Sequence, residues 1–216
     1  MATRRTRPPA PTTIFLVRHG QTPSTGKVLP GRAPGLELAE LGRAQAEAAA
    51  ARLAELPTRP TAVYASPLER TRQTAQPIAR ALGLRVRQDA GLLECDFGEW
   101  TGRRLDALRK RPEWSQVQRA PSLFRFPGGE SFAEMATRGW EAVVSLAERH
   151  RGESIVAVSH ADPIKAILAQ ATGAPLDQFQ RLVVSPCSIS TIVLASSGVV
   201  VLNMNTTGSL KEIALS

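Results

Sequence analysis

The chain has 216 residues, of which 43% are hydrophobic, and a formal net charge of +8. This length can bury a sizeable core and fits one α/β domain better than two. No run approaches the roughly twenty apolar residues that cross a membrane, and the N-terminus lacks an apolar signal segment. We therefore expect a cytoplasmic protein with no membrane partner. The positive charge attracts acidic molecules but does not indicate a fold.

The N-terminal segment and the cysteines are assigned no chemical role. Residues 1–12 are basic and interrupted by proline, which predicts a disordered tail before a single domain at residues 13–216. Cys95 and Cys187 are too few for a disulfide framework and lack the spacing of a metal site, so free thiols are expected.

Short β-branched runs, nearly continuous in apolarity, suit strands of a sheet that is covered on both faces. These runs are residues 14–17, 62–65, 155–158, 192–195 and 199–202. Apolar residues at i, i+3, i+4 and i+7 predict helices between the strands. The helical patterns occupy residues 46–53, 75–82, 140–147 and 164–171.

The order of these elements predicts the fold class. A capping box, or a cap followed by proline, marks helix starts at Ser66 with Glu69, at Ser131 with Glu134, and at Asp162 with Pro163. Alternating strands and helices predict an α/β fold, a three-layer α/β/α sandwich with a mainly parallel sheet and a terminal hairpin around residues 196–198. The irregular stretch at residues 98–130 is expected to form a cap over the site.

Polar side chains follow three of the predicted strands. Arg18 and His19 close the first, Arg70 lies a helical turn after Ser66 beyond the second, and His160 ends another. Ligands of open α/β sheets collect beyond the carboxyl ends of the strands. A single histidine at a strand end is usually structural, but two histidines with two arginines form a cationic pocket that suits phosphate oxygens.

The third histidine of the chain, His150, lies at the end of a predicted helix. Its ordinary interpretation is a cation near a helix C-terminus, and we assign it no role in the site.

Five segments resemble, in order, the motifs of the histidine phosphatase superfamily, in its phosphoglycerate mutase-like branch. They are LVRHGQT, SPLERTRQTA, LLECDFGEW, PGGES and VAVSH. The resemblance implies a phosphoglycerate mutase-like fold and hydrolysis of a small phosphorylated metabolite through a phosphohistidine, with neither a cofactor nor a metal.

The resemblance also implies a role for each charged residue. His19 is the expected nucleophile, and Arg18, Arg70 and His160 are expected to hold the transferring oxygens. The arginines disfavour protonation of His19, which keeps its ring nucleophilic near pH 7. Glu94 is the expected general acid, which protonates the leaving oxygen and then activates water.

Other positions have smaller expected roles. Thr25, Gly31 and Ala161 are expected to bind phosphate or substrate. Thr25 stands where the family usually has asparagine, although its hydroxyl can still donate one hydrogen bond. Asp162 is a second candidate acid, but we interpret it mainly as a helix cap. Glu99 is expected to be a solvated loop residue.

Three functions remain open. Mutases that resemble this chain follow the acid with Arg-His-Tyr, whereas Glu94 is followed by Cys95, Asp96 and Phe97, which favours a phosphatase over a phosphomutase. The basic run at residues 103–111 is either a solvated helix face or a source of substitute cations, so a phosphomutase stays as the alternative. A non-catalytic module that binds phosphorylated ligands is the third possibility.

Nucleic acid is not an expected partner, because the basic run lacks interleaved aromatic residues and has only Trp114 nearby. The oligomeric state and the identity of the substrate are not predicted.

Overall fold

The computed structural model describes residues 10–210. The strands are β1 (Thr12–Arg18), β2 (Ala62–Ala65), β3 (Val86–Gln88), β4 (Ser154–Ser159), β5 (Ile189–Ala195) and β6 (Gly198–Thr206). The α-helices are α1 (Glu40–Ala54), α2 (Glu69–Leu82), α3 (Leu105–Leu108), α4 (Trp114–Arg119), α5 (Phe132–Arg149) and α6 (Ala161–Ala171). The 3₁₀ helices are η1 (Ala90–Leu92), η2 (Gly98–Trp100), η3 (Pro121–Leu123) and η4 (Leu176–Arg181).

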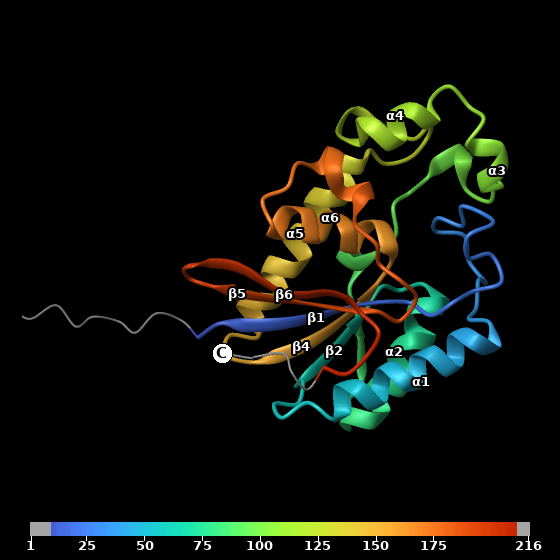
Figure 1. Cartoon of the computed structure of the whole chain (residues 1–216). Helices are drawn as coiled ribbons and strands as arrows, with labels where there is room; N and C mark the ends of the chain where they lie inside the picture. Colours follow the sequence, from blue (N-terminus) through green and yellow to red (C-terminus); the bar gives the residue numbers. More distant parts are fainter. Residues whose placement is uncertain (1–9, 211–216) are drawn as a thin grey trace, which may run out of the picture.

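The strands form one sheet in the order β3-β2-β4-β1-β5-β6 (Figure 1). Strands β3, β2, β4 and β1 are parallel, whereas β5 pairs antiparallel with both β1 and β6. The prediction of a mainly parallel sheet with a terminal hairpin is confirmed. Arg18 lies opposite Ser159 at the end of the β1–β4 ladder, so the next residue of each strand leaves the sheet at the same edge.

The two faces of the sheet carry separate cores, as period-two alternation requires. Ile14 and Leu16 of β1 pack on the side of α5 and α6, and Phe15 and Val17 pack on the side of α1 and α2. Figure 1 shows the sheet between these two helical layers. The predicted α/β/α sandwich is therefore confirmed.

The sequence pattern missed β3 and placed the start of β1 too late. The residues of β3 are partly or fully exposed at the edge of the sheet, so they lack the apolar run that marks a buried strand. Strand β1 already begins at Thr12, inside the range expected for the tail. The disorder expected for residues 1–9 lies outside the described residues.

Of the two predicted capping boxes, one is confirmed. The amide of Glu134 donates to the Ser131 hydroxyl at 3.1 Å, and the amide of Ser131 donates to the Glu134 carboxylate at 2.9 Å. The box at Ser66 was wrong, because α2 begins only at Glu69 with no side-chain cap. The Ser66 hydroxyl is bonded to His160 instead, at 2.9 Å.

The predicted cap of α6 was wrong by two residues. The N-cap is His160, and Asp162 lies in the first turn of the helix. Pro163 is accommodated there because the first amides of a helix have no acceptor within the helix, so proline fits throughout the first turn.

The stretch at residues 98–130 contains η2, α3, α4 and η3, and Figure 1 shows α3 and α4 beyond α6. Its core is aromatic: five of the six phenylalanines of the chain belong to one cluster with Trp100. The Phe126 and Phe132 ring centroids are 5.1 Å apart, and Phe132 contacts Phe179 at the same distance. The first of these edge-to-face contacts anchors the stretch to α5, and the second joins α5 to η4.

No helix within residues 10–210 is long and apolar enough to cross a membrane.

Candidate active site

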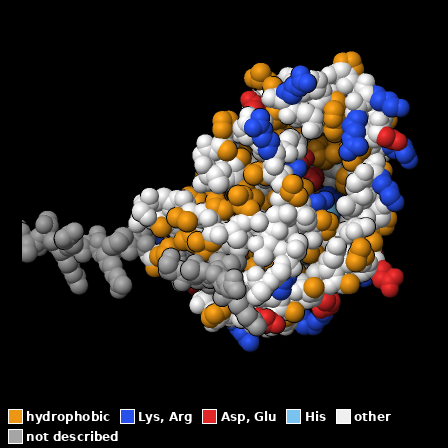
Figure 2. All heavy atoms as spheres, in the orientation of Figure 1, with side chains coloured by type: hydrophobic (Ala, Val, Ile, Leu, Met, Phe, Trp, Pro, Cys, Tyr) orange, Lys and Arg blue, Asp and Glu red, His pale blue; other side chains and the backbone are white. Residues whose placement is uncertain are grey.

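Polar side chains gather where β1, β2 and β4 end. His19 and Glu94 are only 6% and 7% exposed, and Arg70 and His160 are fully buried. Figure 2 shows a hollow on the right of the molecule, below α3 and α4, with basic and acidic side chains inside it. Burial of this many polar groups is costly unless they have partners.

His19 presents one free nitrogen. Its Nδ1 donates a hydrogen bond to the Gly20 carbonyl at 2.8 Å, which leaves the lone pair on Nε2. Burial, followed by the charges of Arg70 and Arg18, holds the pKa of His19 well below its ordinary value. The ring is therefore neutral at pH 7 and nucleophilic at Nε2.

Two arginines are fixed by the backbone and keep further donors free. Arg70 donates from Nη2 to the Gly31 carbonyl at 2.8 Å, and Arg18 donates from Nη1 to the Val184 carbonyl at 2.7 Å. Within the described residues, Arg70 Nε and Nη1 and Arg18 Nε are buried without a hydrogen-bond partner. Unpaired buried guanidinium donors indicate an anion-binding site.

His160 is held by the opposite nitrogen. Its Nε2 is 2.9 Å from the Ser66 hydroxyl, whereas its Nδ1 has no hydrogen-bond partner among residues 10–210 and lies 4.0 Å from Glu94 Oε2. Burial, followed by the charge of Arg70, holds the pKa of His160 well below its ordinary value. Ser66, which the sequence assigned to a helix cap, is thus part of the site.

Glu94 has the properties of an acid that works at neutral pH. Burial, followed by the nearby charge of Asp162, raises the pKa of Glu94 to about 7, against the opposing charge of Arg70. The amide of Cys95 donates to Oε1 at 2.9 Å, so the carboxyl group has a fixed orientation. A carboxyl group with this pKa can both give and accept a proton.

The segment that carries Glu94 is braced by three residues that the sequence analysis missed. Arg32 Nε donates to the Glu94 carbonyl at 2.8 Å, and Arg138 Nη1 donates to the Leu93 carbonyl at 3.0 Å. Glu130 joins the two arginines, at 2.8 Å from Arg32 and 3.0 Å from Arg138. Glu130 lies in the PGGES segment, which was a usable signal, whereas nothing in the sequence distinguishes Arg138 from a solvated helix residue.

The smaller expected roles have different outcomes. The Thr25 hydroxyl accepts from the Thr22 amide at 2.9 Å and is engaged in that turn, so its phosphate contact stays a prediction. Gly31 contributes the carbonyl that holds Arg70 and has a φ of +53°, a backbone conformation that favours glycine. Ala161 opens α6, where free amides attract anions. Glu99 is exposed, as predicted.

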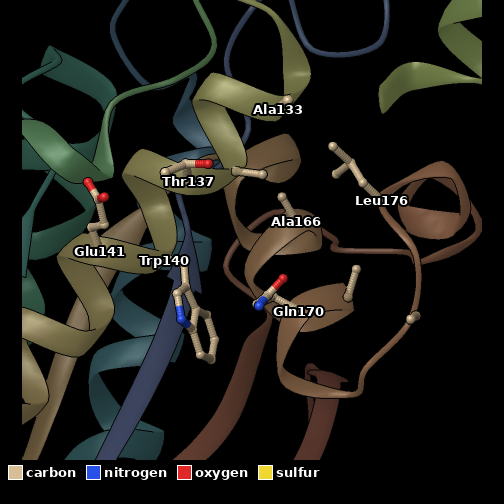
Figure 3. A pocket seen from close by; sticks show the side chains of 10 residues that line it. Ala133, Thr137, Trp140, Glu141, Ala166, Gln170 and Leu176 are labelled. Carbon is tan, nitrogen blue, oxygen red and sulfur yellow. The ribbon is translucent and has the colours of Figure 1, made fainter. Parts of the chain in front are cut away.

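Two cavities of similar size flank α6. The first, of about 360 Å³, lies between α5 and α6 and is lined by residues that include Trp140, Ala166 and Gln170 (Figure 3). The second, of about 350 Å³, is lined from α6 by Asp162 and Lys165. The charge of Asp162 acts on both Arg18 and Glu94, so the second cavity adjoins the histidine site.

Cys95 and Cys187 are buried free thiols, as predicted. Among residues 10–210, no cluster of three or more His, Cys, Asp or Glu side chains has an arrangement that could hold a metal ion.

A buried neutral imidazole beside two arginines and a carboxyl group with a pKa of about 7 has the nucleophile, cations and proton donor that phosphoryl transfer uses. Residues 14–207 match the family model for the histidine phosphatase superfamily (branch 1). Phosphoserine phosphatase 1 of Hydrogenobacter thermophilus is 31% identical over 204 residues, which cover 92% of this chain and 94% of that protein.

Two further relatives extend the comparison. A Salmonella paratyphi C protein named "Probable phosphoglycerate mutase GpmB" is 32% identical over 182 residues, 83% of each chain. The solved structure of mycobacterial glucosyl-3-phosphoglycerate phosphatase has a TM-score of 0.81 at 26% identity and covers 91% of this chain and 99% of its own. The chain belongs to the histidine phosphatase superfamily, as its motifs predict.

Proposed function

We propose that this protein hydrolyses small phosphomonoesters through a phosphohistidine on His19, without a metal cofactor. The observation that carries the proposal is the pairing of a free, unprotonated Nε2 on His19 with unpaired, buried donors on Arg70. The nucleophile and the anion-binding groups are thus complementary to a phosphoryl group.

The substrate phosphate is bound by charge-assisted hydrogen bonds from Arg18 and Arg70. When the Ser66 hydroxyl donates to Nε2 of His160, the proton of that ring resides on Nδ1, which then donates to a phosphate oxygen. The free amides at the start of α6 add positive potential near the same group.

In the first step, His19 Nε2 forms a bond to phosphorus as the bond from phosphorus to the ester oxygen breaks. Glu94 transfers its proton to that oxygen, and the alcohol leaves. In the second step, the Glu94 carboxylate accepts a proton from water, whose oxygen attacks phosphorus and displaces His19. Inorganic phosphate leaves and Glu94 is protonated again.

Hydrolysis is preferred to phosphomutase activity because of the residues after Glu94. Cys95 and Phe97 lie in the buried aromatic cluster, and neither supplies a cation for a substrate carboxylate. The relative named phosphoserine phosphatase supports hydrolysis, and the relative named phosphoglycerate mutase keeps the phosphomutase as the alternative. The two unpaired thiols support our proposal that the enzyme acts in the cytoplasm.

The test is covalent labelling with a ³²P phosphomonoester in the presence of EDTA, with inorganic phosphate measured in parallel. We expect an acid-labile label and phosphate release, both lost in His19→Ala. His150→Gln is the control, because this histidine caps α5 and bonds Tyr64 and Glu153. A label that persists in His19→Ala, or transfer to a second alcohol without phosphate release, would contradict the proposal.

A further inference from the structure

The second cavity beside α6 is joined to the catalytic groups at two points. Asp162 lines it from the first turn of α6, and Phe97 lines it from the segment that carries Glu94. Phe97 also approaches Gly31, whose carbonyl holds Arg70. A phosphomonoester bound at His19 therefore has this cavity available for the part of the substrate that leaves.

The walls of the cavity are mainly apolar. Leu105 and Trp114 line it from α3 and α4, and Phe126 and Phe132 of the aromatic cluster also line it. A volume of about 350 Å³ is at the small end of the range for small-molecule sites, roughly 300 to 1,000 Å³. These surfaces favour a compact hydrocarbon or aromatic body over a polyol, because contact with it removes apolar area from water.

Two cations line the cavity from separate elements, Arg109 at the end of α3 and Lys165 on α6. Within the basic run, Arg104 is paired with Asp106 at 2.7 Å and Arg111 with Glu113 at 2.9 Å. The backbone amide of Arg109 donates to the Leu105 carbonyl at 2.9 Å, but its guanidinium makes no hydrogen bond or ion pair with any residue that the structure describes. Arg109 thus differs from Arg104 and Arg111, whose charges are already neutralised by a nearby carboxylate.

Lys165 is a largely buried cation, with a side chain only 16% exposed. Its Nζ lies 3.5 Å from Asp162 and donates to Gln180 Oε1 at 3.2 Å, which leaves the amide nitrogen of Gln180 as a donor. Arg109 and Lys165 together with Asp162 give the cavity wall a net charge of +1. That charge matches a single carboxylate better than a second, dianionic phosphate.

We infer that the preferred substrates are phosphomonoesters whose alcohol has a compact apolar or aromatic body ending in a carboxylate, which Arg109 and Lys165 bind in this cavity. The inference rests on the proposed phosphatase function and specifies its substrate class. Arg109 and Lys165 thereby have a role in specificity, because they contact the leaving group rather than the phosphoryl group that is transferred.

The test compares two esters that differ in one charge, 4-carboxyphenyl phosphate and 4-carbamoylphenyl phosphate. Their ring size is equal, and the carboxamide withdraws electrons more strongly than the ionised carboxylate. Leaving-group reactivity by itself therefore favours the carbamoyl ester, so a kcat/KM preference for the carboxylate ester reports binding of its charge. We expect the carboxylate ester to be preferred about tenfold, which corresponds to about 1.4 kcal/mol. p-Nitrophenyl phosphate is assayed first, because its hydrolysis tests the phosphatase function alone.

Arg109→Gln and Lys165→Gln are each expected to bring the ratio of the two esters close to one, and Arg109→Lys to restore part of it. Lys110→Gln is the matched control: Lys110 belongs to the same basic run, is exposed and does not line the cavity, so the ratio stays at its wild-type value. If Arg109 had only a structural role, Arg109→Gln would slow the hydrolysis of both esters equally.

The failures are distinguishable. If p-nitrophenyl phosphate is hydrolysed but the wild-type ratio is near one, or survives Arg109→Gln, the substrate class is overturned and the phosphatase function stands. If the wild-type protein hydrolyses none of the three esters, the proposed function fails and this inference falls with it.

Discussion

The ring centroids of His19 and His160 lie 5.2 Å apart, with ring planes inclined by 62°. Each ring is held by a different nitrogen, Nδ1 to Gly20 in one and Nε2 to Ser66 in the other. The free nitrogen of His19 is therefore a lone-pair donor, and that of His160 can carry a proton. In the mechanism that we propose, two residues of the same type thus have complementary roles at one phosphoryl group.

Glu94→Gln is expected to slow alkyl phosphates by about 10² to 10⁴ in kcat/KM, because the leaving alkoxide loses its proton donor. The leaving group of p-nitrophenyl phosphate needs little protonation, so the kcat/KM for this ester falls much less. Because Gln cannot activate water, the phosphohistidine accumulates, and a burst of p-nitrophenol is expected in stopped-flow measurements. An equal fall in kcat/KM for both ester classes would contradict the acid role.

The wild-type kcat/KM for alkyl phosphates is expected to fall as the pH rises through about 7, where Glu94 of the ligand-free enzyme loses its proton. His19 stays neutral across this range, because its pKa is held well below the ordinary value, so its protonation limits activity only at lower pH. A pH–rate profile from pH 4 to 9 checks both limbs. The limb near pH 7 should be absent in Glu94→Gln.

Glu94 also predicts a pH-dependent stability of the ligand-free protein. The pKa of its carboxyl group is raised from 4.5 to about 7 on folding, so its contribution is fully present below pH 4.5 and is lost as the pH rises through 7. Glu94→Gln is expected to gain free energy of unfolding relative to wild type over this window, by up to about 3 kcal/mol. Urea titrations at pH 5 and pH 8 measure the gain, and a difference that is the same at both pH values would contradict the prediction.

Arg70→Met is expected to weaken inhibition by inorganic phosphate at least tenfold and to lower kcat/KM by more than about 100-fold, because two charge-assisted donors are lost. The matched control is Arg72→Met, an exposed arginine on the same helix. Inhibition constants for phosphate separate binding from turnover. If phosphate inhibited Arg70→Met as strongly as it inhibits the wild type, Arg70 would not be a phosphate-binding residue.

Glu130→Gln is expected to loosen the segment that carries Glu94, because Arg32 and Arg138 lose the carboxylate that joins them. We expect a roughly tenfold lower kcat for alkyl phosphates and a nearly unchanged inhibition constant for phosphate. Glu148→Gln, at an exposed position of α5, is the control. If phosphate binding weakened as much as kcat fell, Glu130 would be supporting the whole pocket rather than the acid.

Much of the fold and the charged centre of the site could be predicted from local patterns. The central residues of β1 and β4 are continuously apolar because both faces of the sheet are covered there, so Arg18 and His160 at the strand ends stand out in the sequence. The Ser131 capping box depends on residues three apart, and it was predicted correctly. Strand β3 was missed because it has only three residues, of which Val86 alone is apolar.

The sequence by itself determined the layered sheet, its two-sided core and which polar residues follow its strands. The reason is that burial on both faces of a sheet requires apolar runs, and the polar residue that ends each run can be recognised in the sequence. Only the tertiary structure decided which donors of Arg70 stay free and that Ser66 forms a hydrogen bond with His160. It also decided that Arg109 lines the cavity without an ion pair, whereas Arg104 and Arg111 are paired with carboxylates. The physical reason is that a hydrogen bond or an ion pair depends on which partner packing brings within reach, and packing joins residues that no local pattern connects.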